Sequence, residues 1–528
     1  MAIRSRLVLL SLLGVLVLPS REVLAQEAAT DLPAGVPDLD AWVERTLETF
    51  EVPGVAITIV KDGEVVLARG FGVRRIGEST PVDARTRFGI ASNTKAFTAA
   101  ALGLLVEDGM LEWDASVIDY LPWFQMWDPW VTREITVRDL LVHRSGLGLG
   151  QGDLLYWPES DFTRREIVEA VRYLEPVTSF RSAYAYDNIL YHVAALVIEE
   201  VSGLTWEDFV QARIIEPLGM EDTRVTRAST LEEGNVATPH ARIEGTVRPV
   251  VPLAATATNA AGGINSTAAD MAKWLIVQLD SGRVSGSERI FSGRTTTQLW
   301  KPVTPLPIGR VPEGMEPMQA QFAGYALGFG IRDHRGQKMI THTGGLPGYV
   351  SRVTMIPGLK LGIAVLTNQE MGVAFESITN RILDHYLEAE PRDWITLFRD
   401  LQARRDSTVA ARDHSAAAER DSTSRPSLPL EGYAGTYRDA WYGDIEIMEE
   451  EGGLAIQFSR TESLLGDLEH WQFDTFYVRW RDRELRADAF ITFELATDGT
   501  VAGARMKAAS PSVDFSYDFH DLDLRRVP

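Results

Sequence analysis

The sequence contains no cysteine, and this absence excludes several kinds of chemistry at once. A chain without cysteine has no disulfides, no thiolate nucleophile and no cysteine-ligated zinc or iron–sulfur site. Cationic residues are also few: 52 lysines and arginines face 74 aspartates and glutamates, which leaves a net charge of −22 at pH 7. Such an acidic chain repels phosphate backbones and anionic membrane surfaces, so we expect no nucleic-acid partner. A small molecule or a peptide is the expected partner, and the sequence leaves the oligomeric state open.

Long apolar runs are rare, and the one that stands out lies within the first 25 residues. Arg4 and Arg6 precede thirteen mainly apolar residues, 7–19, and Val23-Leu24-Ala25 then offers a cleavage point. This is the pattern of a secretory signal peptide. A membrane anchor is the alternative, but thirteen residues fall short of the ~20 that cross a bilayer. We therefore expect residues 1–25 to be removed, the mature chain to be exported to the periplasm or the extracellular space, and no membrane span to remain.

The pattern of apolar residues from 36 to 395 predicts an α+β domain. Helices are expected at 38–50 and at about 373–388, with a region of helices and loops between about 90 and 300. Strands are expected at 55–60, 64–72, 325–333, 337–342, 349–356 and 361–368, and Asp62-Gly63 is a hairpin signal between the first two. These pieces can form one antiparallel sheet with both terminal helices on one face. The middle region then supplies a helical subdomain.

The composition changes near residue 398. Residues 399–427 are rich in Arg, Asp, Ala and Ser, which is typical of a linker, part of which can be a solvated helix. We expect few shared contacts between the parts that it joins. From 428 to 528 short alternating strands predict a small β-barrel. The expected strands are 434–437, 443–448, 454–459, 471–480, 490–495, 501–507 and 513–519.

The residues that stand out for chemistry are Ser92 and Lys95, which form the only S-x-x-K in the sequence. They lie at the expected start of a helix, three residues apart, so both side chains project from one face. A serine hydroxyl needs a base to become a nucleophile, and a desolvated lysine amine can serve. The alternative is a helix-capping serine with a surface lysine. Against it, the chain has 45 arginines and only 7 lysines, so a surface cation would normally be arginine.

Two later motifs accompany this pair: Ala185-Tyr186-Asp187-Asn188, and His342-Thr343-Gly344-Gly345 in the expected meander of strands. Together the three motifs resemble those of the serine β-lactamase and penicillin-binding-protein superfamily. The resemblance is to the branch that includes class C β-lactamases, D-stereospecific aminopeptidases and related esterases. It covers roughly residues 36–390 and implies a β-lactamase/transpeptidase-like fold: an antiparallel sheet flanked by helices, plus a helical subdomain.

The resemblance also implies roles for the motif residues. Ser92 would be the acylated nucleophile, while Lys95 and Tyr186 would share a proton network that accepts the serine proton and passes it to the leaving group. Asn188 would orient Lys95 and touch the substrate. The backbone N–H groups of Ser92 and Gly345 would form the oxyanion hole, and His342, Thr343 and Gly344 would line the substrate-binding strand. Without the other motifs, the favoured interpretation of Tyr186 and Asn188 would be a packed aromatic residue and a helix cap.

His342 departs from the lactamase pattern, where lysine is usual. A histidine is mostly neutral at pH 7, so it gives no fixed positive charge for a substrate carboxylate. This favours esters, amides or D-amino-acid peptides as substrates, with at most weak β-lactamase activity. For His143, in a family-like loop, a structural role is favoured over a catalytic one. The remaining histidines form no ligand-spaced cluster, so we predict no metal and no cofactor.

The stretch Leu430–Tyr437 resembles the start of a lipocalin-like domain appended to some of these hydrolases. Such a domain can bind ligand, restrict access to the active site, mediate assembly, or be purely structural. The predicted organisation is thus a signal peptide (1–25), a hydrolase domain (36–395), a linker (399–427) and a barrel domain (428–528). The predicted function is an exported serine hydrolase that works through an acyl-enzyme. The alternative is a penicillin-binding-like protein that binds or senses cell-wall fragments without turnover.

Overall fold

The computed structural model describes residues 35–450 and 452–528, so the predicted signal peptide lies outside the described residues. An eight-stranded antiparallel sheet forms the centre of the α+β domain, in the order β2-β1-β14-β13-β12-β11-β10-β9. Its strands are β1 (Gly54–Lys61), β2 (Glu64–Gly72), β9 (Thr304–Pro305), β10 (Ala323–Tyr325), β11 (Gly330–His334), β12 (Gln337–Leu346), β13 (Tyr349–Ile356) and β14 (Leu361–Thr367). The N-terminal strand β1 pairs with the late strand β14, which confirms the prediction of one sheet built from both ends of the domain.

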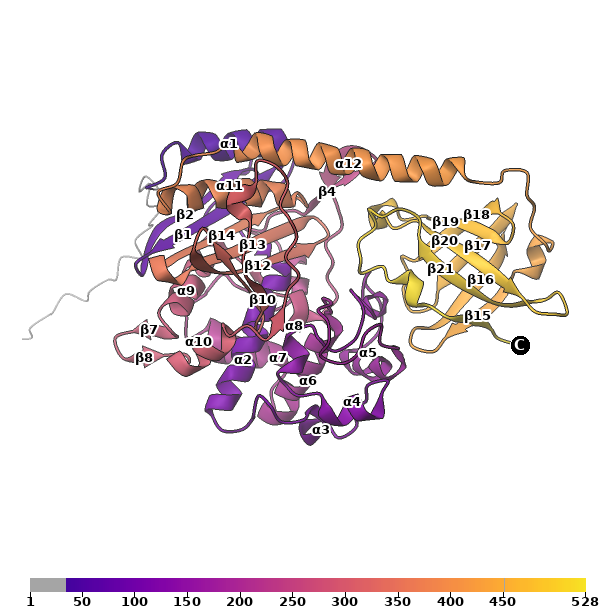
Figure 1. The fold of residues 1–528 in the computed structure, drawn as a ribbon, viewed down its shortest axis with the longest axis horizontal. Helices are drawn as coiled ribbons and strands as arrows, with labels where there is room; N and C mark the ends of the chain where they lie inside the picture. Colours follow the sequence, from indigo (N-terminus) through magenta and orange to yellow (C-terminus); the bar gives the residue numbers. More distant parts are fainter. Residues whose placement is uncertain (1–34, 451) are drawn as a thin grey trace, which may run out of the picture. The chain divides into compact units, whose positions relative to one another are not determined.

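Helices cover both faces of this sheet (Figure 1). The terminal helices α1 (Leu39–Phe50) and α11 (Gly372–Tyr386) share one apolar core with the sheet, as predicted, and α9 (Ala268–Leu279) lies against β1 and β14 on the other face. Beyond α9 lies α2 (Lys95–Glu107), an alanine- and leucine-rich helix that is buried along nearly its whole length. This burial gives the start of α2 a fixed position beside the sheet.

The helical subdomain follows α2 in sequence. Its helices are α3 (Val117–Tyr120), α4 (Pro129–Glu134), α5 (Arg164–Ala170), α6 (Ile189–Ser202), α7 (Trp206–Val210), α8 (Asn259–Gly262) and α10 (Gly293–Leu299). Three two-stranded sheets accompany them: β3 (Phe88–Gly89) with β6 (Asn265–Ser266), β4 (His240–Ile243) with β5 (Thr246–Pro249), and β7 (Arg283–Ser285) with β8 (Glu288–Arg289). Among the described helices no single one is long and apolar enough to cross a membrane. Only α6 taken together with residues 206–215, across a 75° bend, reaches that length and composition.

The predicted strand at 325–333 is wrong, because two strands occupy this region. β10 ends at Tyr325 and β11 begins at Gly330, and the two pair as a hairpin. Gly328 in the turn has φ +77°, and a Cβ there would lie 2.7 Å from the carbonyl oxygen of Lys95. The turn therefore packs directly against the start of α2, and only glycine fits this approach.

The C-terminal strands form a closed antiparallel barrel in which each strand pairs with the next and β15 closes on β22. The strands are β15 (Gly435–Asp439), β16 (Gly443–Glu450), β17 (Gly453–Phe458), β18 (Leu465–Gln472), β19 (Thr475–Trp480), β20 (Ala489–Leu495), β21 (Val501–Ala508) and β22 (Leu524–Arg526). Alternating buried residues fill the barrel interior, as its small diameter requires. The predicted barrel is confirmed.

Two predicted barrel strands need correction. The range 471–480 covers the end of β18, a turn at Phe473-Asp474 and β19. The range 513–519 is not a strand, although its apolar residues alternate; it forms a loop that leads into a short 3-10 helix at Phe519–Asp521. Phe515 of this range contacts Tyr186 of the α+β domain, while Phe519 packs on Phe458 and Trp480 inside the barrel.

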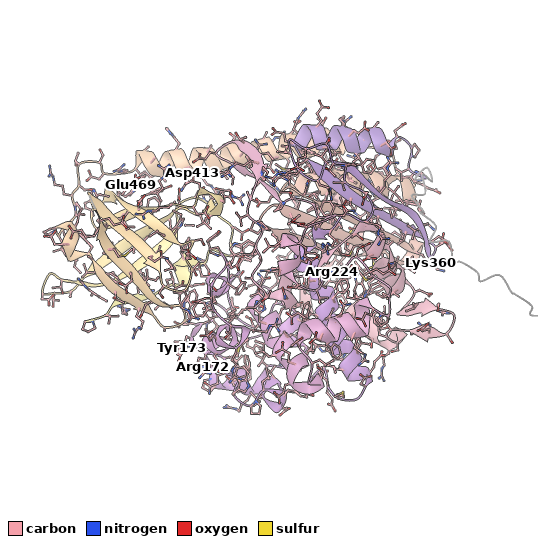
Figure 2. The ribbon with its side chains drawn as sticks, turned by 180° about the vertical axis from the view of Figure 1, so that it is seen from behind. Arg172, Tyr173, Arg224, Lys360, Asp413 and Glu469 are labelled. Atoms are coloured by element: carbon pink, nitrogen blue, oxygen red, sulfur yellow. The ribbon has the colours of Figure 1, made fainter. Side chains whose placement is uncertain are left out.

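The range 399–427 is largely helical, since α12 spans Trp394–Ala418. Its first turns bury Trp394 and Phe398 in an apolar cluster with α11, and most of its remaining length is exposed. On that exposed part Asp413, labelled in Figure 2, accepts a hydrogen bond of 3.0 Å from the Ser510 hydroxyl of the barrel. Residues 419–427 then connect the helix to the barrel.

The expectation of few shared contacts between the α+β domain and the barrel is wrong. Arg460 of the barrel forms ion pairs with Asp161 and Glu166. The rings of Phe162 and Tyr442 lie edge to face with centroids 5.7 Å apart, and the buried apolar residues of both parts belong to one continuous cluster. Because the barrel is joined through a common core, it is part of the architecture that surrounds the site described next.

Candidate active site

The predicted nucleophile lies in a short turn that contacts both strand β12 and helix α2. Ser92 lies in the 3-10 turn η1 (Ala91–Thr94), which leads directly into α2. Ala91 adopts φ +49°, a strained value for a residue other than glycine. Gly344 on β12 approaches so closely that a Cβ there would lie 2.3 Å from the carbonyl oxygen of Ile90. The strained turn and the glycine together fix Ser92 beside strand β12.

Lys95 is completely buried, and its ammonium reaches three acceptors. Nζ lies 3.1 Å from Ser92 Oγ, 2.7 Å from Asn188 Oδ1 and 2.9 Å from the carbonyl oxygen of Ala261. No carboxylate among the described residues forms an ion pair with it. Burial lowers the pKa of Lys95 to about 7, opposed by Asp153 and aided by the charge of Arg227. A neutral Lys95 can still donate to Asn188 and Ala261, which leaves its lone pair facing the Ser92 hydroxyl.

Tyr186 lines one pocket together with Ser92. Lys95 Nζ is 4.9 Å from the centroid of the Tyr186 ring. Burial raises the pKa of Tyr186 well above its ordinary value, so the phenol stays protonated at neutral pH. In the proton network that the family resemblance implied, Tyr186 is therefore the member that keeps its proton. The buried ring of His143 packs behind Tyr186, with centroids 4.3 Å apart, which is a supporting contact.

Asn188 links Lys95 to a carboxylate that the sequence motifs did not include. While Oδ1 accepts from Lys95, Nδ2 donates to Asp153 Oδ2 at 2.8 Å. Asp153 is fully buried and also accepts from the hydroxyls of Tyr156 and Ser516. Burial raises the pKa of Asp153 to about 7, and its three hydrogen bonds oppose this rise. The amide of Asn188 is therefore held from both ends, which fixes its orientation toward Lys95.

His342 occupies the place predicted for it on β12 and is neutral. The Tyr325 hydroxyl lies 2.7 Å from Nε2, and the carbonyl oxygen of Thr343 lies 2.6 Å from Nδ1. A proton on Nδ1 satisfies both bonds, with Tyr325 as the donor to Nε2. Burial and the nearby charge of Lys95 lower the pKa of His342 to about 3. The histidine thus adds no positive charge to the site at any ordinary pH.

A pocket of about 290 Å³ brings the predicted residues together. Its lining includes Ser92, Tyr186, Asn188, His342, Thr343 and Gly345, and we call it the catalytic pocket. Lys95 is not part of the lining but contacts the lining residue Ser92, and Gly344 packs against Ile90 and Ala91. Arg227, which no motif indicated, also lines the pocket.

The barrel completes one wall of the catalytic pocket with residues 514–516. The Ser516 hydroxyl donates to Asp153 Oδ2 at 2.8 Å, and the Phe515 ring lies 6.2 Å from that of Tyr186, edge to face. Asp518 accepts the backbone N–H groups of Gly152 and Leu154 at 2.6 and 2.9 Å. These contacts anchor residues 513–518, which we call the barrel loop. No sequence pattern indicated this position, because the loop is more than 300 residues away from its partners along the chain.

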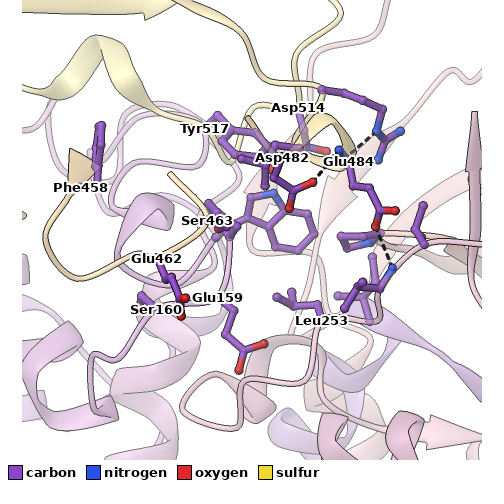
Figure 3. Close-up of a pocket in the computed structure, with 18 of the residues that line it drawn as sticks. Glu159, Ser160, Leu253, Phe458, Glu462, Ser463, Asp482, Glu484, Asp514 and Tyr517 are labelled. Atoms are coloured by element: carbon purple, nitrogen blue, oxygen red, sulfur yellow. Dashed lines mark hydrogen bonds between the residues drawn. The ribbon is translucent and has the colours of Figure 1, made fainter. Parts of the chain in front are cut away.

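A larger cleft of about 1220 Å³ opens beside the catalytic pocket, shown in Figure 3. Both cavities share Trp157, Gly345, Leu346 and Asp514, so they are continuous. The labelled residues of Figure 3 come from both domains: Glu159, Ser160 and Leu253 from the α+β domain, and Phe458, Glu462, Ser463, Asp482, Glu484, Asp514 and Tyr517 from the barrel. The lining of the cleft combines apolar and acidic side chains with three arginines, Arg460, Arg481 and Arg486. Residues 35–450 and 452–528 contain no cluster of three or more side chains suited to a metal ion.

The geometry defines a class of protein: a serine and a buried lysine lie at one helix start, a tyrosine lies beside them, and the interior strand β12 lines the same pocket. This is the arrangement of a serine hydrolase whose base is an amine. The chain belongs to the Beta-lactamase family, whose model matches residues 39–387, about two thirds of the chain. Residues 419–526 match a domain of unknown function, DUF3471.

Relatives and solved structures agree with this family. The unguisins hydrolase of Aspergillus violaceofuscus is 28% identical over 451 residues, which cover 81% of this chain and 79% of the relative. A penicillin-binding protein homologue of Pyrococcus abyssi, described as octameric, has the same fold at 24% identity and a TM-score of 0.59, covering 87% and 96% of the two chains. A D-stereospecific amidohydrolase of Streptomyces gives a TM-score of 0.51 at 22% identity, covering 64% and 97%.

Proposed function

We propose that the protein is an exported serine hydrolase that cleaves amides, peptides or esters through an acyl-enzyme on Ser92. The observation that carries this proposal is the buried Lys95, 3.1 Å from Ser92 Oγ, with a pKa of about 7. An amine of that pKa is partly neutral at physiological pH, so it can accept a proton from a hydroxyl. A surface lysine with a pKa near its ordinary value could not do so.

In the proposed reaction Lys95 takes the Ser92 proton as Oγ attacks the substrate carbonyl carbon. The negative charge that develops on the carbonyl oxygen is stabilised by the backbone N–H groups of Ser92 and Gly345. Tyr186, held as a neutral phenol, donates its proton to the leaving group and regains one from Lys95. The bond to the leaving group breaks and leaves an ester on Ser92. Water then attacks this ester with the same groups, releasing the acid and restoring Ser92.

Amides and peptides are favoured over β-lactams because His342 is neutral and places no cation on the substrate-binding strand. The large cleft next to the catalytic pocket leaves space for substrates longer than a simple ester. The name of one structural neighbour, a D-stereospecific amidohydrolase, is consistent with an amide substrate, and that of the unguisins hydrolase is consistent with hydrolysis. Export is proposed from residues 1–25, and the partner is the substrate itself.

The test compares kcat/KM for a nitrophenyl acetate, a D-alanyl amide and a chromogenic cephalosporin with one enzyme preparation, alongside Ser92→Ala. We expect turnover of the ester and of the amide, slow turnover or a persistent adduct with the cephalosporin, and no activity in the variant. If the cephalosporin is the best substrate, the proposed substrate class is wrong. If the protein forms an adduct with all three and releases none, it is a binding protein without turnover.

A further inference from the structure

Arg227 is a buried cation in the catalytic pocket. It begins the 3-10 helix η6 (Arg227–Leu231), and its side chain lines the same cavity as Ser92, Tyr186 and Asn188. Only 4% of the residue is exposed to solvent, which makes it the most buried arginine among the described residues. Its position therefore cannot be explained as that of a solvated surface charge.

The guanidinium of Arg227 lacks the partner that a buried charge normally has. No carboxylate of the described residues forms an ion pair with it, and its Nη1 has no hydrogen-bond partner among them. Nε reaches only the carbonyl oxygen of Gly262, at 3.5 Å. By contrast, the next most buried arginines, Arg87 and Arg352, are paired with Glu232 and Glu376.

The residues around Arg227 hold its backbone in place and leave space for its side chain. The side chain of Asn259 accepts the backbone N–H of Arg227 at 3.1 Å and so fixes the start of η6. Gly262, which also lines the pocket, gives the guanidinium its space, because a Cβ there would lie 3.1 Å from Nη2. Burial lowers the pKa of Arg227 only to about 10, so the group remains charged at neutral pH.

We infer that Arg227 binds a carboxylate of the substrate in the catalytic pocket. The inference rests on the proposed function and deepens it by naming a chemical group of the substrate. A carboxylate supplies the charge and the acceptor atoms that the guanidinium lacks, and it matches the two-pronged geometry of arginine. His342, which holds the position where lactamase relatives have lysine, is neutral, so the positive charge of this pocket comes from Arg227 and lies on a different wall.

The kinetic test uses two pairs of aryl esters, each a carboxylic acid with its methyl ester. One pair carries the carboxylate on the acyl chain (a nitrophenyl hemisuccinate), and the other carries it on the leaving group (an acetoxybenzoate). In one of the two pairs, we expect the wild-type enzyme to cleave the acid with a higher kcat/KM than the methyl ester. In that pair, Arg227→Gln should lower the ratio of kcat/KM for the acid to kcat/KM for the methyl ester by at least about tenfold. Arg227→Lys should keep part of the preference. Arg165→Gln, a half-exposed arginine paired with Glu169, should not change the ratio.

The failure of the carboxylate site and the failure of the proposed function give different results. If the neutral esters are cleaved but neither acid is preferred and Arg227→Gln changes no ratio, the inference is wrong while the proposed function stands. If no ester is cleaved by wild type and Ser92 takes up no acyl group, the proposed function fails. In that case a binding measurement tests the inference. Succinate should raise the unfolding temperature of the Ser92→Ala variant above its value in chloride of equal ionic strength. This increase should be absent in the double variant that also carries Arg227→Gln. An equal gain in both proteins would overturn the carboxylate site.

Discussion

At the residue scale, the burial of Lys95 predicts how activity depends on pH. Its pKa of about 7 lies far below the ordinary value of 10.5, because burial disfavours the ammonium form. The neutral amine is the base, so kcat/KM for a neutral ester should rise with pH through a midpoint near 7 and level off above it. It should fall tenfold for each pH unit well below that midpoint.

Lys95→Arg provides the check on this interpretation. An arginine keeps the positive charge but does not lose its proton, so kcat/KM on the plateau above pH 7 should fall by at least about 10²-fold. The acid limb near pH 7 should disappear from the residual activity. A wild-type profile that is flat from pH 5 to 9 would show that Lys95 is not the titrating base.

Gly344 allows a second residue-scale prediction. A Cβ at this position would lie 2.3 Å from the backbone oxygen of Ile90, whereas the space beside Gly345 is open. Gly344→Ala should therefore push strand β12 away from η1, lower the free energy of unfolding by about 1–3 kcal/mol and reduce acylation of Ser92. Gly345→Ala should cost less stability. Denaturant unfolding of both variants measures the difference, and equal losses would contradict this description of the contact.

The sequence identified the residues whose spacing is local, and it could not identify those that meet only in the fold. Ser92 and Lys95 are one helical turn apart, so their shared face follows from helix geometry. Asp153, Arg227 and Ser516 come from three segments far apart in the chain, and nothing in their neighbours along the chain points to the pocket. Their places beside the pocket come from contacts between residues far apart in the chain, which only the packed structure reveals.

At the element scale, the barrel loop is expected to limit the acyl groups that the catalytic pocket accepts. Phe515 is 41% exposed and stands edge to face with Tyr186 at the pocket wall. Phe515→Ala should enlarge the pocket and raise kcat/KM for a bulky aryl ester relative to an acetate by about tenfold.

The matched control is Phe473→Ala, another exposed phenylalanine of the barrel, which lies in the turn between β18 and β19. It should leave the ratio unchanged. The same ratio in wild type and Phe515→Ala would mean that the loop does not select the acyl group.

The errors of element prediction have a common cause. The barrel loop has the alternation of a strand in Val513, Phe515 and Tyr517, but Phe515 packs on Tyr186 of the other domain and Tyr517 on Phe519, so no neighbouring strand pairs with the loop. The region of β10 and β11 reads as one strand because its turn is apolar and packs on α2. The alternation of apolar and polar residues indicates which side chains are buried, but it does not indicate which residues they pack against.

At the scale of the whole molecule, the shared core predicts that the barrel supports the hydrolase domain. A chain that ends at Ala403 loses the barrel loop and the contacts of Phe162 and Asp161 with the barrel. We expect it to unfold at a lower temperature than the full chain and to react more slowly with a fluorophosphonate serine probe. Calorimetry and the labelling rate measure both effects. Identical values for the shortened and the full chain would mean that the two domains are independent, as the linker composition alone had indicated.

The central claim is that Ser92 becomes acylated with Lys95 as the base. The most direct measurement is mass spectrometry of acid-quenched enzyme during turnover of a nitrophenyl ester, followed by peptide mapping. The account predicts a mass increase of one acyl group, located on Ser92, that disappears as substrate is exhausted. Ser92→Ala should show no adduct, and Lys95→Arg should show one only after much longer incubation. Steady turnover with no adduct on Ser92, or an adduct on another residue, would contradict the account.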